Sequence, residues 1–210
     1  MTEPEPVPLN GPDLAPVHPE DGPQDIPQEP GSVVDLARLL VAPMQSTMGT
    51  FLDKARSQLG YSEQAGGWTK YGQWYTDTIA HDTAFATANW CDMFVSWCAD
   101  QCGLADVVGQ FAYTPWHAQW FADHGRWGRT PHPGDIVFYD WDGGKAISAI
   151  QHVGIVESVR SGAVVALEGN TSNAMMRRVR SMSFVVGCGY PDHSSASTAD
   201  DTAIVVSLGA

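Results

Sequence analysis

The segment Asn89–Cys98 has the sequence NWCDMFVSWC, and the rest of the chain is organised around it. Asn89 is a residue type that caps helices, and the acidic Asp92 next to Cys91 would complement the positive end of a helix dipole. Apolar residues then recur at helical spacing, with polar residues on the opposite side. We therefore expect an amphipathic helix that begins near Cys91 and ends at Gly103.

The position of Cys91 in the first turn of this helix suggests a chemical role. The positive end of a helix dipole lowers the pKa of a thiol and favours the nucleophilic thiolate. The first peptide N–H groups of a helix have no partner within it, so they can stabilise a developing oxyanion. The alternative is a buried cysteine that only packs on an apolar stripe. Residues further along the chain favour the chemical role.

Composition divides the chain into four parts. The first thirty residues hold nine prolines and seven acidic residues, and no Lys or Arg precedes Arg38. Such a segment buries too little apolar surface to offset its ordering entropy, so we predict a disordered or polyproline-like arm over 1–31. We predict a docking or packing helix over 32–48, one catalytic domain over 49–192, and a linker with an apolar tip over 193–210.

The charge of the chain excludes some partners. The net charge is -13, of which the arm contributes -7 and the remainder -6. Nothing resembles a basic groove, so we expect no nucleic-acid partner. The only basic cluster, Arg177, Arg178 and Arg180, is typical of a solvated strand face. No apolar stretch is long enough to span a bilayer, and the acidic start lacks the pattern of a secretion signal. We therefore expect synthesis in the cytoplasm and no membrane partner.

The four cysteines do not predict a disulfide framework in a chain of this length. Cys98 and Cys102 lie one helical turn apart and are typical of core residues. Whether Cys188 pairs with one of them stays open. The spacing of Cys91, Cys98 and Cys102 along one helix lacks the paired ligands of a zinc site.

The second half of the chain predicts a small antiparallel sheet beneath the helices. A turn at 131–135 leads into the buried strand Ile136–Tyr139. The strands His152–Val159 and Ala163–Glu168 form a hairpin around Ser161–Gly162. Further strands are expected over 175–182 and 183–189, and further helices over 33–41, 51–59 and 116–124. The fold class is α+β.

The hairpin brings two chemically useful residues together. His152 begins one strand and Glu168 ends its partner, and in an antiparallel pair the start of one strand lies beside the end of the next. A base next to an orienting carboxylate is half of a nucleophile–base–orienter triad. The helix that carries Cys91 needs only to pack its N-terminus against that end of the sheet.

Four segments of the chain, in the order in which they occur, resemble the CHAP domain, the cysteine- and histidine-dependent amidohydrolase/peptidase family that cuts bacterial peptidoglycan. The resemblance implies a papain-like cysteine-peptidase fold with N-terminal helices packed on a small antiparallel sheet. The matching segments are Trp90–Trp97, Pro133–Phe138, His152–Glu157 and Glu168–Thr171.

Residue by residue, Cys91 resembles the nucleophile of the family, His152 its base, Glu168 its third member and Asn170 a further polar residue of the site. The implied substrate is an amide bond of the stem peptide or cross-bridge. The resemblance does not separate an endopeptidase from an N-acetylmuramoyl-L-alanine amidase.

Some members of the CHAP family bind calcium through acidic residues before the nucleophile. Here Asp77 and Asp82 lack the alternating oxygens of such a site, so we expect no cofactor and no obligatory metal. We interpret the other histidines, His81, His117, His124, His132 and His193, as structural or solvated.

The whole chain resembles a bacteriophage lysin, either released at lysis or built into a virion. The arm and the apolar tip at 203–208 suggest tethering to phage structural proteins. Two alternatives stay open. One is a non-catalytic wall-binding or structural virion component with this fold. The other is a related thiol enzyme acting as a deamidase or transglutaminase on host protein.

Overall fold

The computed structural model describes residues 44–191, with side chains from residue 48 onward. The predictions for the arm, for a helix over 33–41 and for the C-terminal linker and tip lie outside these residues. The main helices are α1 (Met44–Arg56), α2 (Lys70–Tyr75), α3 (Cys91–Gln101), α4 (Ala105–Val108) and α5 (Thr114–Asp123), with short turns η2 (Thr76–Ala80), η3 (Thr83–Thr87) and η4 (Ile147–Ala149). The strands are β1 (Trp127–Gly128), β2 (Ile136–Tyr139), β3 (His152–Arg160), β4 (Ala163–Thr171), β5 (Ala174–Ser181) and β6 (Val185–Gly189).

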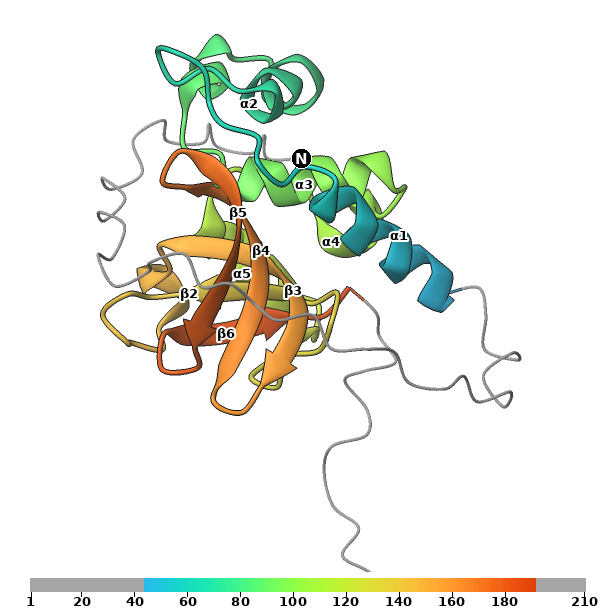
Figure 1. Ribbon diagram of the computed structural model, residues 1–210, viewed down its shortest axis with the longest axis vertical. Coiled ribbons are helices and arrows are strands. Elements are labelled where there is room, and N and C mark those ends of the chain that lie inside the picture. The colour runs from blue at the N-terminus through green and yellow to red at the C-terminus, as the bar shows by residue number, and fades with distance from the viewer. Residues whose placement is uncertain (1–43, 192–210) are drawn as a thin grey trace, which may run out of the picture.

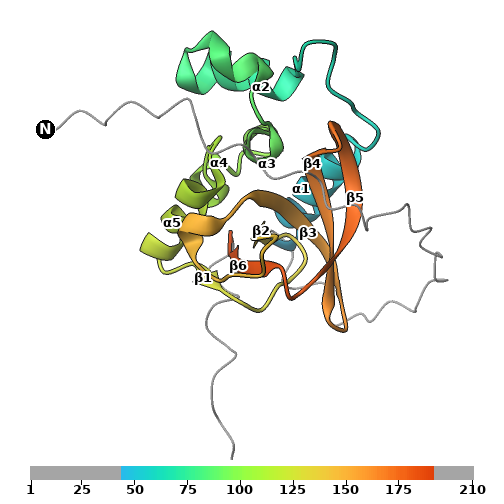
Figure 2. The ribbon, with the colours of Figure 1, turned by 90° about the vertical axis from the view of Figure 1, so that its left-hand side faces the viewer.

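The six strands form one antiparallel sheet in the order β1-β6-β2-β3-β4-β5 (Figure 1). The predicted hairpin is present as β3 and β4, with Ile155 opposite Leu167. A register shift between Val156 and Ser158 bends it. Helices precede and cover this curved sheet (Figure 2). The structure therefore confirms the expected α+β class, with N-terminal helices on a small antiparallel sheet.

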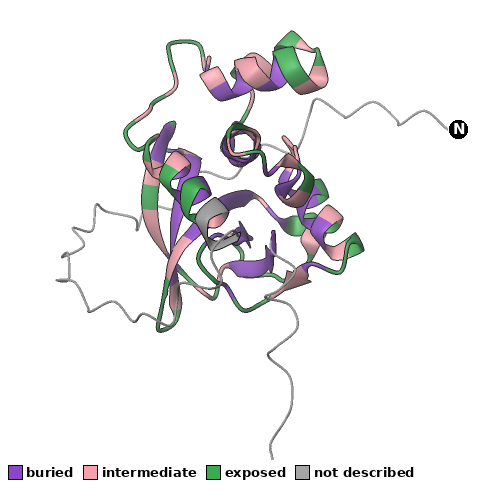
Figure 3. Cartoon of the chain, turned by 90° about the vertical axis from the view of Figure 1, so that its right-hand side faces the viewer, coloured by how far each residue is buried: buried purple, intermediate pink, exposed green. Residues whose placement is uncertain are grey.

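The sheet separates two apolar cores. On one face, residues of β2, β3 and β4 pack against α1, α3 and α5, and Phe94 of α3 is fully buried there. On the other face, alternate residues of the same strands, such as Val156 and Ala166, form a second cluster together with Tyr139. Strands β2, β4 and β6 are mostly buried, whereas β5 and the end of β3 include exposed residues (Figure 3). This two-residue alternation follows from the pleat of a strand with both faces covered.

Close packing of α3 on β4 depends on Gly169. A Cβ atom at this position would lie 2.7 Å from Cβ of Phe94 and 2.9 Å from the ring of Trp90. Only glycine allows the strand that carries Glu168 to approach the helix that carries Cys91 so closely.

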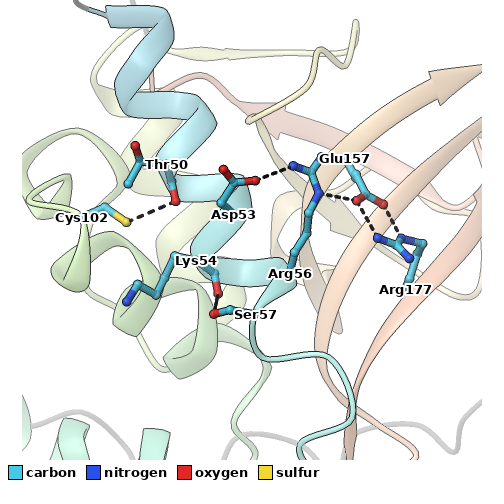
Figure 4. Close-up of polar contacts among 8 residues, drawn as sticks. All are labelled: Thr50, Asp53, Lys54, Arg56, Ser57, Cys102, Glu157 and Arg177. Atoms are coloured by element: carbon cyan, nitrogen blue, oxygen red, sulfur yellow. Dashed lines mark hydrogen bonds and ion pairs between the residues drawn. The ribbon is translucent and has the colours of Figure 1, made fainter. Parts of the chain in front are cut away.

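Helix α1 is fixed to the sheet by polar contacts around Glu157 (Figure 4). Arg56 Nε donates to Glu157 Oε1 at 2.7 Å, and Arg177 Nη2 donates to the same oxygen at 2.8 Å. Asp53 accepts from Arg56 Nη1 at 2.9 Å, and the thiol of Cys102 faces the carbonyl oxygen of Thr50 at 3.8 Å. These groups are partly exposed, so each pair stabilises the fold only modestly.

Three local predictions were wrong in detail. The first described helix begins at Met44 and ends at Arg56, so Leu59 lies beyond it with 37 % of its surface exposed. Asn89 does not cap α3, because Trp90 occupies the N-cap position without a side-chain hydrogen bond. The fifth helix begins at Thr114, where Pro115 fits the first turn because its missing N–H needs no partner there.

Two further elements differ from the sequence prediction. Helix α3 ends at Gln101, two residues before Gly103. The two-residue strand β1 was not predicted. In the described part of the chain, no helix is long and apolar enough to cross a membrane.

All four cysteines lie within the described residues, and none forms a disulfide. Cys98 is fully buried in the helix-facing core, whereas Cys188 is buried on the opposite side of the sheet. The sheet itself therefore separates Cys188 from Cys98, and the open question of their pairing is answered by this arrangement.

Candidate active site

The predicted base and carboxylate meet at the end of the β3–β4 hairpin. His152 Nε2 lies 3.1 Å from Glu168 Oε2. The carboxylate is fully buried and His152 is 8 % exposed. Because an ionised carboxylate can only accept, this contact places the ring proton on Nε2 and leaves Nδ1 free to take a proton.

Two further residues hold Glu168 in place. Arg180 donates to both carboxylate oxygens, from Nε at 3.1 Å and from Nη2 at 2.7 Å, and Thr171 Oγ1 donates to Oε2 at 3.0 Å. Burial alone would raise the pKa of Glu168. The charges of Arg180 and His152 and their hydrogen bonds outweigh burial and lower the pKa to about 2. Glu168 is therefore ionised throughout the range in which enzymes work.

Aromatic rings enclose the other sides of the histidine. The ring of Tyr139 lies 6.0 Å from that of His152 and nearly parallel to it, and the ring of Trp141 lies 5.6 Å away. The guanidinium of Arg180 lies 4.7 Å from the centre of the Trp141 ring, over its face. The imidazole is thus held by packing as well as by its hydrogen bond to Glu168.

Gly154 provides the space that Glu168 occupies. It follows His152 by two residues on the same face of β3, and a Cβ atom there would lie 2.8 Å from Cγ of Glu168. Position 154 therefore needs a glycine because the side chain of Glu168 occupies the space that a Cβ atom would fill, and not because the chain turns there.

We therefore expect Gly154→Ala to displace Glu168 and to lower kcat by roughly a hundredfold, because small misplacements of catalytic groups have effects of that size. Overpacking should also reduce the free energy of unfolding by about 1–3 kcal/mol. Gly49→Ala in α1 is the matched control, because a Cβ atom there meets nothing within 4 Å. Wild-type kcat in Gly154→Ala would contradict this role.

Cys91 is the first residue of α3, as predicted, but its thiol differs from the expected one. Only 3 % of Cys91 is exposed. Burial and the nearby charge of Asp92 raise its pKa to about 12, and the backbone N–H groups of Asp92 and Cys91 oppose this only in part. The prediction that the helix terminus lowers the pKa was wrong because desolvation outweighs the dipole. The resting residue is a neutral thiol.

The thiol and the imidazole are not hydrogen-bonded to each other in the described structure. The charge of Glu168 contributes to the raised pKa of Cys91. Asn170 Nδ2, two residues after Glu168, donates to Asn89 Oδ1, two residues before Cys91, at 3.1 Å. Asn170 has a left-handed backbone with φ of 61°. It therefore links β4 to the approach of α3 and does not contact the charged pair.

Sequence reasoning missed Arg180 and Thr171. Arg180 had been interpreted as part of a solvated strand face, but it is only 5 % exposed. Residues 176, 178 and 180 of β5 share a face with Glu168 in the observed register. The two-residue spacing of Arg178 and Arg180 is the one signal that could have indicated this.

The remaining acidic and histidine side chains lie elsewhere or have local partners. Asp82 accepts from the backbone N–H of Ala84 at 2.9 Å, and Asp77 accepts from Gln73 at 2.9 Å. Within residues 44–191, no group of three or more His, Cys, Asp or Glu side chains is arranged to hold a metal ion. His124, the C-cap of α5, is exposed, whereas His117 is fully buried.

One protein-family model matches the part of the chain that carries this site. Residues 82–170 match the family model of the CHAP domain. This segment of the chain is similar to a CHAP domain. The matched segment includes all four residues predicted for the site, Cys91, His152, Glu168 and Asn170, and ends before Arg180. The resemblance is thereby confirmed over residues 82–170, and it supports the class of a cell-wall amidase or peptidase.

Several solved structures are similar to this chain. The peptidoglycan hydrolase RipB from Mycobacterium tuberculosis is 17 % identical, with 78 % of this chain and 74 % of that chain covered and a TM-score of 0.45. A protein similar to an NLP/P60-family lipoprotein from Staphylococcus aureus is 14 % identical, with 70 % and 42 % covered and a TM-score of 0.38. Ly7917, in a structure with the hydrolysing product of MDP, is 19 % identical, with 69 % and 62 % covered and a TM-score of 0.40. No curated protein matches the sequence.

Proposed function

We propose that this chain hydrolyses an amide bond in the peptide part of bacterial peptidoglycan, with Cys91 as nucleophile and His152 as general base and acid. The observation that carries this proposal is the buried His152–Glu168 pair at 3.1 Å, next to the helix that begins with Cys91. A buried ionised carboxylate against a strand histidine serves to fix a tautomer that can accept a proton at Nδ1.

The neutral resting thiol determines the first step. Because the pKa of Cys91 is about 12, the thiolate must form by proton transfer to His152 as the substrate carbonyl is attacked. The sulfur then bonds to the carbonyl carbon, and the peptide N–H at the start of α3 stabilises the oxyanion. His152 returns the proton to the leaving amine, and water releases the acyl group from the sulfur. Glu168 stabilises the imidazolium that exists between these steps.

The bond that is cut is either one in the stem peptide or cross-bridge, or the one between the lactyl group and L-alanine. Mass spectrometry of the fragments from digested peptidoglycan separates these possibilities. A new amino terminus within a stem or bridge identifies an endopeptidase, whereas a free lactyl carboxylate with a new L-alanine amine identifies an amidase. Fragments with new reducing sugar ends and intact peptides would contradict both.

We further propose a bacteriophage lysin or virion-associated wall hydrolase, made in the cytoplasm and acting on the wall. Support comes from the acidic, proline-rich residues 1–31 and the apolar tip at 203–208, which suit attachment to phage structural proteins. Finding the chain in purified virions by mass spectrometry would support the virion form. Its restriction to free cytosolic monomers at lysis would contradict attachment.

A non-catalytic wall-binding component is the second candidate. The observation in its favour is the buried thiol of Cys91, which makes no hydrogen bond to His152 in the described structure. This candidate predicts binding to cell walls without release of fragments, and equal behaviour of the wild type and a Cys91→Ala variant.

A further inference from the structure

A second buried pair of charged side chains lies directly beside the nucleophile. Asp92 follows Cys91 in the first turn of α3, and its Oδ1 lies 2.7 Å from Nδ1 of His117 on α5. The other ring nitrogen, Nε2, lies 2.6 Å from the carbonyl oxygen of Val108, the last residue of α4. Asp92 and His117 are both fully buried. One imidazole therefore joins the first turn of the nucleophile helix to two other helices.

Aromatic packing fixes the plane of this imidazole. Phe111 stacks on one side of the His117 ring at 4.7 Å, and Phe121 stacks at 5.1 Å, each inclined by 20°. The edge of Phe138 on the sheet lies 5.3 Å away. These ring contacts fix the orientation in which the imidazole makes its two hydrogen bonds.

The hydrogen-bond partners determine the charge of the pair. The Val108 carbonyl can only accept, so Nε2 of His117 carries a proton. The contact between Nδ1 and Asp92 holds one further proton, and the pair has no net charge whichever atom carries it. The second oxygen of Asp92, Oδ2, is buried without a hydrogen-bond partner. Neutralisation of Asp92 therefore rests on His117.

An unneutralised Asp92 would act directly on the thiol. The negative charge of Asp92 is, after burial, the largest contribution that raises the pKa of Cys91. It also contributes, after burial, to raising the pKa of Tyr75 on α2 to about 12, so this phenol stays neutral. The other charged or titratable groups facing Cys91 are Glu168 and its partner His152, across the sheet ends. Neither Glu168 nor His152 bonds to Asp92 in the described structure; His117 does.

We propose that His117 is a positioning residue for the thiol: it neutralises Asp92 and ties the first turn of α3 to α5, so that a thiolate can form at Cys91 without an uncompensated negative charge beside it. This inference rests on the proposed role of Cys91. Its test uses alkylation of the sulfur, which can be measured whether or not the chain cuts cell walls.

The experiment compares full-length wild type with three variants: His117→Gln, Asp92→Asn and the double variant. Glutamine keeps an N–H donor for Asp92 but carries no charge, and asparagine removes the carboxylate. Each protein is treated with iodoacetamide at a series of pH values, and modification of Cys91 is followed by peptide mass spectrometry. Cys102, which directly follows α3, is the internal control, because it is outside the pair and its modification rate should not change.

We expect His117→Gln to slow alkylation of Cys91 by on the order of tenfold at a fixed pH, because an unpaired carboxylate close by disfavours the thiolate. Asp92→Asn should react as fast as the wild type or faster. The double variant should resemble Asp92→Asn, so removing the carboxylate rescues the loss of the imidazole.

A role limited to packing predicts the opposite relation, in which the double variant is at least as slow as His117→Gln. That result, or an unchanged rate in His117→Gln, would overturn the proposal. If His117→Gln does not fold, Asp92→Asn decides alone, and slower alkylation of Cys91 in that variant rejects the proposed role. Alkylation that follows the expected order in a chain that releases no wall fragments would reject the proposed function and retain this inference.

Discussion

Cys91→Ala is expected to lower the release of soluble peptidoglycan fragments at least about a thousandfold, because removing a nucleophile eliminates the covalent route. Burial of Cys91 does not weaken this expectation, since the thiol needs to lose its proton only when the substrate is in place. The fold should survive, because alanine keeps the helix and removes one small side chain. Release of fragments from purified cell walls, measured as new amino groups, gives the rate.

Cys102→Ala is the matched control for this variant. Cys102 directly follows α3, is partly exposed, and its thiol contacts only the carbonyl oxygen of Thr50 among the hydrogen-bond partners in the described structure. Its removal should leave the rate within a few-fold of the wild type. Equal rates in Cys91→Ala and the wild type would exclude thiol catalysis and leave the wall-binding alternative.

Glu168→Gln is expected to have the second-largest effect, on stability as well as on activity. The substitution keeps the shape of the side chain but leaves the buried guanidinium of Arg180 without its counter-charge. Breaking one side of a buried ion pair typically costs about 3–5 kcal/mol. It also removes the charge that stabilises the His152 imidazolium, so kcat should fall on the order of a hundredfold or more. Urea unfolding and steady-state kinetics measure the two effects.

Glu157→Gln is the control for charge loss. Glu157 is likewise a strand carboxylate with two arginine partners, Arg56 and Arg177, but it lies against α1 and is partly exposed. Its loss should reduce the free energy of unfolding by about 1 kcal/mol and leave kcat unchanged. A similar loss of kcat in both variants would show that the effect of Glu168→Gln is not specific to the site.

The pH dependence of stability provides an independent test of the Glu168 environment. The folded state lowers the pKa of Glu168 from 4.5 to about 2, so its contribution is complete above pH 4.5 and is lost as the pH falls toward 2. The contribution amounts to roughly 3 kcal/mol. The difference in unfolding free energy between the wild type and Glu168→Gln should therefore shrink over this range. A constant difference from pH 5 to pH 2 would contradict the lowered pKa.

Sequence reasoning predicted the part of the site that depends on local pairing. His152 and Glu168 are joined by a short hairpin, so their proximity follows from strand periodicity alone. Cys91 opens a helix with a clear apolar stripe, so its position at the helix terminus was also predictable. What could not be read from the sequence is burial, and the predicted pKa of the thiol failed for that reason.

The missed residues depend on tertiary packing. Arg180 reaches Glu168 because β5 pairs with β4 in one particular register, set by the two-residue turn at Ser172 and Asn173 together with a register shift between Glu168 and Thr171. His117 reaches Asp92 because α5 crosses the start of α3, and a histidine within a helix gives no sign of its partner. Both residues are buried charged groups whose partners lie on other elements, so composition and periodicity describe them equally well as solvated.

The central claim is that the thiol of Cys91 performs the reaction, and one measurement on the unaltered chain tests it most directly. The protein is partly alkylated with iodoacetamide, and the remaining activity on purified peptidoglycan is compared with the fraction of Cys91 and of Cys102 modified in the same sample. The account predicts that activity falls in direct proportion to modification of Cys91 and independently of Cys102. Full activity in a sample whose Cys91 is completely modified would contradict it.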